Sequence, residues 1–123
     1  MNTLAWVLTA VCAVAFLGSG TVKSVMSKQR LIETGQTGVA PFPLPVIRIV
    51  ALTEIVSVAG LILPAATGIA EYLTPVAAGW LAIVMIGAAL SHGSLHEYKQ
   101  VAFVNAPLFA ALVTVAAIRI AGL

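Results

Sequence analysis

The sequence predicts an all-α polytopic membrane protein, a bundle of four transmembrane helices that forms a single domain over residues 1–123. Hydrophobic residues make up 61% of the chain and charged residues 8%, whereas soluble domains carry about a quarter charged residues. Four apolar stretches approach the roughly 20 residues that a helix needs to cross a bilayer. Since these stretches are apolar on all sides, they lack the alternation of β-barrel strands.

We expect helices over residues 3–22, 44–63, 74–92 and 105–122, with a basic cytoplasmic loop over residues 23–43. The first stretch lacks the basic start of a signal peptide, so we interpret it as a mature span. In the loop, the segment KSVMSKQRLIE mixes apolar and basic residues, which suits a short helix on the membrane surface. The segment TGQTGVAPFPLP, with two glycines and three prolines, predicts irregular backbone.

The start of the fourth span has two interpretations. The helix begins either at Val101, with Pro107 as an internal kink, or at Asn105 as N-cap with Pro107 in the first turn. We prefer the second, because the missing N–H of a proline costs little in a first turn.

Lysines and arginines near the span ends predict the orientation. They concentrate in the first and third connections, as Lys23, Lys28, Arg30 and Lys99, whereas residues 64–73 carry only Glu71. We therefore expect both termini outside the cytoplasm, which cysteine labelling from either side of the membrane would check.

Composition also limits the chemistry. The net charge of +2 includes no basic cluster, which argues against a nucleic-acid partner. Cys12 is the single cysteine, so one chain has no intramolecular disulfide and no dithiol couple. A thiol in the middle of a span is usually a small buried hydrophobe.

Glu54 lies at the middle of the second span, where an unpaired carboxylate is very costly. Arg48, six residues earlier, projects about 120° away around the helix, so a partner on another helix is at least as good a candidate. Thr53, Ser57 and Gly60 continue a polar and small side of this helix. We expect that side to face the bundle interior.

Lys23, Arg48 and His92 are expected at similar depth on three helices, near Glu54. One hypothesis makes these four residues a ligand or quinone site, with the three cations around one anionic or carbonyl group. The alternative is structural: Lys23 extends toward water, Arg48 neutralises Glu54, and His92 caps its helix.

His92 and His96 are spaced as two metal ligands on one helix face would be. The signal is weak because Gly93 and Ser94 are positioned to end the helix, and no third ligand is near. We expect no metal centre.

Small residues recur at four-residue steps and predict close helix packing. They are Ala5, Thr9 and Ala13 in the first span, Gly87 and Ser91 in the third, and Ala102, Ala106, Ala110 and Thr114 in the fourth. A stripe of this kind that pointed outward would instead be a face for oligomerisation.

Several motifs, in this order, resemble the DoxX-like family: FLGSG with Lys23, then Arg48 and Glu54, GLILP, TPVAAGWL, and MIGA followed by His92. The resemblance covers almost the whole chain and implies a small four-helix protein, with Lys23, Arg48, Glu54 and His92 at the characteristic polar positions. It also implies an association with membrane sulfur and thiol redox systems such as thiosulfate:quinone oxidoreductase, or an accessory role, in a bacterial cytoplasmic membrane.

Three functions remain open at this stage, and the sequence does not decide whether the protein is an enzyme. We favour a non-catalytic accessory or assembly subunit of a larger membrane complex, with no cofactor of its own and with lipid, other subunits or further copies as partners. The alternatives are a quinone-interacting oxidoreductase subunit and a carrier of a small hydrophobic molecule. A carrier needs a cavity, which Trp80 and Leu81 would line and for which four helices leave little space.

Overall fold

The computed structural model describes residues 2–123, which are almost entirely helical and contain no strand. The helices are α1 (Asn2–Val25), α2 (Lys28–Glu33), α3 (Leu44–Thr67), α4 (Leu73–Ser94), α5 (Tyr98–Gln100) and α6 (Ala106–Ala121). A 3₁₀ turn, η1 (Thr37–Val39), precedes α3, and a π turn, η2 (Val101–Asn105), joins α5 to α6. The stretches long and apolar enough to cross a membrane are α1, α3, α4 and the continuous helix Tyr98–Ala121. The predicted fold class, a four-helix membrane bundle, is confirmed.

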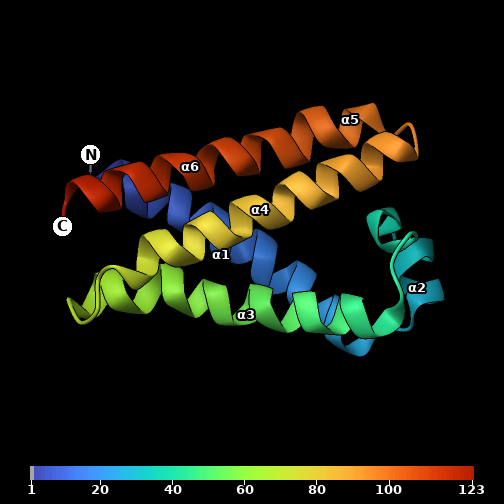
Figure 1. Cartoon of the computed structure of the whole chain (residues 1–123), viewed down its shortest axis with the longest axis horizontal. Coiled ribbons are helices and arrows are strands. Elements are labelled where there is room, and N and C mark those ends of the chain that lie inside the picture. The colour runs from blue at the N-terminus through green and yellow to red at the C-terminus, as the bar shows by residue number, and fades with distance from the viewer. Residues whose placement is uncertain (1) are drawn as a thin grey trace.

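The four spans form a ring of neighbours, in which α1 and α4 each pack against both α3 and α6. Figure 1 shows both termini at one end of the bundle, beside the turn between α3 and α4, while α2 and α5 lie at the other end. We call the second end the basic end, because it carries Lys23, Lys28, Arg30 and Lys99.

The core of the bundle is built from small and aliphatic residues of all four spans. In α1, Ala5 and Thr9 are fully enclosed and Ala13 is buried, so this stripe is an internal packing surface as expected. In the fourth span, by contrast, Ala102 of η2 and Ala106 and Ala110 of α6 are exposed on the outer face.

The fourth span begins earlier than expected. Helical backbone runs from Tyr98, and Asn105 has helical φ and ψ with no side-chain capping bond, so its assignment as an N-cap is wrong. The interior Pro107 cannot donate to the carbonyl four residues earlier, and its ring crowds that carbonyl. The wider π turn immediately before Pro107 accommodates both the missing hydrogen bond and the crowded carbonyl.

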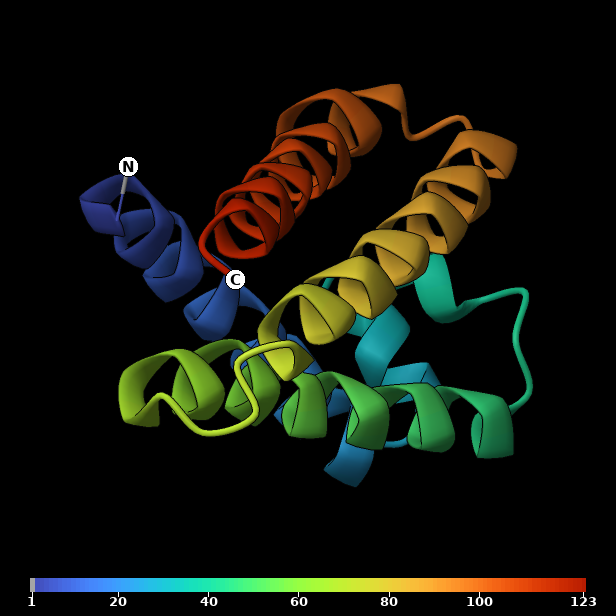
Figure 2. The ribbon, with the colours of Figure 1, turned by 60° about the vertical axis from the view of Figure 1, so that its left-hand side comes forward.

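The connection between α1 and α3 is more ordered than its composition suggests. The expected surface helix is split, because α1 continues to Val25 and α2 has only six residues, capped by a bond from Arg30 N–H to the Ser27 hydroxyl. Leu31, Val39 and Ile47 form a second buried cluster that holds the connection against the bundle. Figure 2 shows the segment around η1 lying against the end of α4.

Candidate functional site

A cavity of about 250 Å³ lies toward the basic end, between α1, α3, α4 and the connection that contains η1. Most of its wall is apolar. Its lining residues include Val50, Ile83, Val84, Gly87 and Ala88, and the polar side chains at it are Lys23, Gln36, Glu54, Trp80 and His92. Three of the four predicted site residues therefore meet at one cavity, and Arg48 does not line it.

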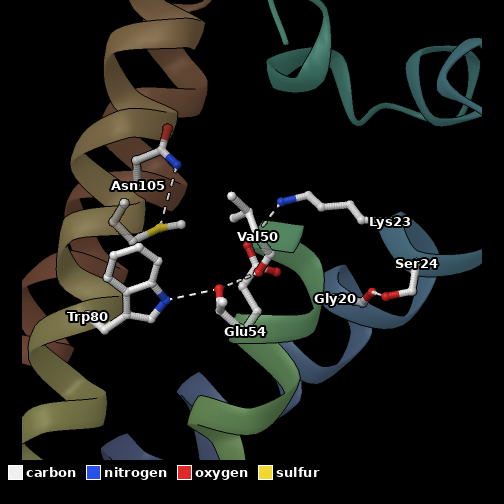
Figure 3. Close-up of polar contacts among 9 residues, drawn as sticks. Gly20, Lys23, Ser24, Val50, Glu54, Trp80 and Asn105 are labelled. Atoms are coloured by element: carbon white, nitrogen blue, oxygen red, sulfur yellow. Dashed lines mark hydrogen bonds and ion pairs between the residues drawn. The ribbon is translucent and has the colours of Figure 1, made fainter. Parts of the chain in front are cut away.

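Glu54 is completely buried on α3 and makes an ion pair with Lys23 of α1, whose Nζ lies 3.2 Å from Oε1. Figure 3 shows the Lys23 side chain reaching toward Glu54 from the neighbouring helix. The helices approach closely because Gly20 has no side chain: a Cβ there would lie 3.0 Å from the Ala51 carbonyl oxygen. The costly unpaired carboxylate expected from the sequence is avoided, because Lys23 on another helix is the partner of Glu54.

Arg48 does not neutralise Glu54, and that part of the structural interpretation is wrong. Its guanidinium donates a hydrogen bond of 2.8 Å to the backbone carbonyl of Lys23. The two residues point to different faces of α3, as their spacing of six positions requires. Arg48 instead satisfies a carbonyl in the last turn of α1 and holds the backbone that carries Lys23.

Trp80 forms a wall of the cavity from α4. Its indole N–H donates to the Thr53 hydroxyl at 3.0 Å, and that hydroxyl donates in turn to the Val50 carbonyl at 2.6 Å. Leu81, the next residue, is fully buried in the core of the bundle and does not line the cavity. The expectation for Leu81 was wrong, and so was the expectation that four helices leave little space, because the ordered connection adds a further wall.

His92, near the end of α4, bonds a neighbouring carboxylate and does not cap its helix. Its Nδ1 lies 2.9 Å from Glu97 Oε1, and the Thr37 hydroxyl lies 2.8 and 2.7 Å from the two Glu97 oxygens. Ser91 donates to the Gly38 carbonyl at 2.5 Å. We call these contacts the latch, because they hold η1 over the basic end of the cavity.

Gly38 suits the close contact of η1 with His92. A Cβ at this position would lie 2.8 Å from Nε2 of His92, so any larger residue would have to displace the imidazole ring. Sequence reasoning missed Thr37, Gly38 and Glu97. Thr37 and Gly38 have partners more than 50 positions away, which no local pattern marks. Glu97 lies only five positions from His92, but its contact depends on the chain turning back after the end of α4.

His96 is separated from His92 by the end of α4 at Ser94. It has a left-handed backbone, with φ of 60°, and its Nδ1 lies 3.0 Å from the Tyr98 hydroxyl. The continued helix on which a metal pair would depend is not formed. Within residues 2–123, no three His, Cys, Asp or Glu side chains are grouped as metal ligands would be.

The latch should weaken in acid. Bonds from His92 and Thr37 hold the pKa of Glu97 below its usual value, which is about 4.3. A carboxylate with a lowered pKa stabilises the fold above its ordinary pKa, and this contribution is lost as pH falls through the lowered value. The melting temperature of the wild type should exceed that of Glu97→Gln at pH 6, and the difference should shrink below about pH 4.

The matched control is Glu33→Gln, which removes an exposed carboxylate on α2 that is bonded only to Gln29. Its melting temperature should stay near that of the wild type across the same pH range. An equal effect of both substitutions, or a difference that grows in acid, would contradict the role assigned to Glu97.

Fold and site together define a small four-helix membrane protein with a charged pair and a histidine at a partly open cavity. The family model described as the DoxX-like family matches residues 7–117, so the chain belongs to the DoxX-like family. The match spans all four membrane helices and the residues of the cavity. Searches of curated proteins and of solved structures found no match.

Proposed function

We propose that this protein binds a small, largely apolar molecule with a polar head group, in the cavity between α1, α3 and α4. The observation that carries the proposal is the composition of that cavity: apolar walls with Lys23, Glu54 and His92 at the same partly open space. Ligand sites are commonly apolar with a few polar groups that fix the orientation of the ligand.

The size of the cavity suits one substituted ring. A cavity of about 150 Å³ is enough for benzene, and the cavity here measures about 250 Å³. Val46, Trp80 and Ile83 line it and are also 40%, 39% and 59% exposed on the outside of the bundle. These residues belong to α3 and α4, so we infer that a ligand enters from the lipid between those helices.

A quinone is the ligand that the family resemblance implies, and the residues of the cavity fit its head group. Lys23 and His92 carry N–H groups that suit a carbonyl oxygen, and the apolar wall suits a ring. A quinone would supply two-electron redox chemistry when bound. The chain would bind and orient it, and shield its ring from water.

A second candidate function is that of an accessory subunit in a larger membrane complex, and the outer face of η2 and α6 favours it. Ala102, Ala106 and Ala110 are exposed at four-residue steps, and small residues of this kind let another transmembrane helix approach closely. With its single cysteine, the chain would leave thiol chemistry to that partner. In both functions we place the basic end in the cytoplasm of a bacterium.

Two glycines of α4 allow a matched test of cavity binding. A side chain at Gly87 would project into open space at the cavity, whereas one at Gly79 would project into open space outside it. Purified wild-type protein should show a higher melting temperature and quenched tryptophan fluorescence when a short-chain benzoquinone is added. Gly87→Leu should lose both effects by filling the cavity, and Gly79→Leu should keep them.

Loss of binding in both variants, or in neither, would argue against this cavity. Association is tested separately, by mild solubilisation and mass spectrometry of wild type and Ala106→Leu. An accessory subunit should release its partner when the small-residue face is filled, while the benzoquinone response persists.

A further inference from the structure

Only one of the two oxygens of the Glu54 carboxylate has a hydrogen-bond partner. Oε1 accepts the hydrogen bond from Lys23, while Oε2, fully buried, has no hydrogen-bond partner among residues 2–123. The Ser19 side chain of α1 lies near enough to act as a weak hydrogen-bond donor to the carboxylate, but no bond of ordinary geometry joins it to Oε2. Buried polar atoms without any partner are rare in folded proteins, so the free oxygen calls for a physical reason.

Three donors at or beside the cavity already have acceptors. The Trp80 indole donates to Thr53, and the Thr53 hydroxyl donates to Val50. The imidazole Nδ1 of His92 faces Glu97. None of these groups is available to Oε2 without breaking a bond that the structure already makes.

The ion pair also decides the kind of partner that Oε2 requires. With the Lys23 ammonium 3.2 Å from its other oxygen, we take Glu54 as the ionised partner of that pair, and an ionised carboxylate accepts hydrogen bonds but cannot donate them. Since Glu54 lines the cavity, a group there that carries an O–H or N–H would supply the partner that Oε2 lacks.

We propose that the ligand of this cavity is a ring that bears a hydroxyl group, and that this hydroxyl donates a hydrogen bond to Oε2 of Glu54. The inference rests on the proposed function and narrows its ligand class. A carbonyl or an ether offers only acceptors, so it would leave Oε2 unpaired and place two acceptors together. For a ring that exists in carbonyl and hydroxyl forms, the same argument favours the hydroxyl form.

The test compares two probes with the same ring and alkyl chain, 4-hexylphenol and 4-hexylanisole, in which an O–H donor is replaced by an O–CH3 group. Binding to wild-type protein in detergent is measured by calorimetry and by the shift in melting temperature. We expect the phenol to bind at least tenfold more tightly. In Glu54→Gln the ratio of the two affinities should fall close to one, because a neutral amide can donate to the ether as well as accept from the phenol.

Ser57→Ala is the matched control: Ser57 is a buried polar residue on α3 that does not line this cavity, and its loss should leave the ratio unchanged. Equal binding of both probes to the wild type would overturn the hydroxyl inference and leave cavity binding intact. A phenol preference that persists in Glu54→Gln would also overturn it. Binding of neither probe would count against the proposed function itself.

Discussion

Lys23→Met is expected to destabilise the protein by about 3 kcal/mol or more, the cost of removing one member of a buried ion pair. Methionine keeps most of the length and volume of the lysine side chain but removes its charge. Glu54, which is completely buried, would then lose its partner at 3.2 Å and have both oxygens unpaired. Reversible unfolding in mixed detergent micelles measures the change in the free energy of unfolding.

A double-mutant cycle separates this pair from its neighbours. Adding Glu54→Gln to Lys23→Met should restore most of the lost stability, because no charge is then stranded. Adding Glu54→Gln to Arg48→Ala should show weaker coupling than the Lys23 pair, since Arg48 acts on the carboxylate only through the Lys23 backbone. Strong coupling of Arg48 to Glu54, without coupling of Lys23, would contradict the pairing described here.

Hydropathy alone predicts the fold of this protein, because the bilayer allows few architectures. A stretch of about 20 apolar residues must close its own backbone hydrogen bonds as a helix. The same reasoning does not place the ends of a helix. The fourth span was expected to begin at Asn105 because Pro107 normally belongs in a first turn, and a π turn allowed the helix to begin at Tyr98.

The sequence predicted which residues form the polar site better than it predicted which of them bond to one another. The position of Glu54 in the middle of a span requires a partner, but the choice between Arg48 and Lys23 depends on which helices lie side by side. That arrangement follows from contacts such as Gly20 against Ala51, which carry no signal in a single sequence. The cavity was also unpredictable, because one of its walls is the connection around η1, held by Ser91 through a backbone carbonyl.

Gly20→Leu is expected to cost ~3 kcal/mol, at the upper end of the usual penalty for overpacking a core. Even a Cβ would lie 2.9 Å from Ile55 Cγ1 and 3.0 Å from the Ala51 carbonyl oxygen, and a backbone atom inside a helix has little freedom to move. Helices α1 and α3 would have to separate. Lys23 lies one turn after Gly20, so separation would also lengthen its contact with Glu54.

Gly18→Leu is the matched control on the same helix, because a side chain at Gly18 would meet nothing within 4 Å. It should be neutral or slightly stabilising, since replacing a helical glycine lowers the cost of ordering the backbone. Unfolding measured for both variants should therefore differ by several kcal/mol although the substitution is the same. If Gly20→Leu unfolds like Gly18→Leu, the close approach of α1 to α3 does not hold Lys23 against Glu54, and the ion pair must be maintained by the bond from Arg48 to the Lys23 backbone.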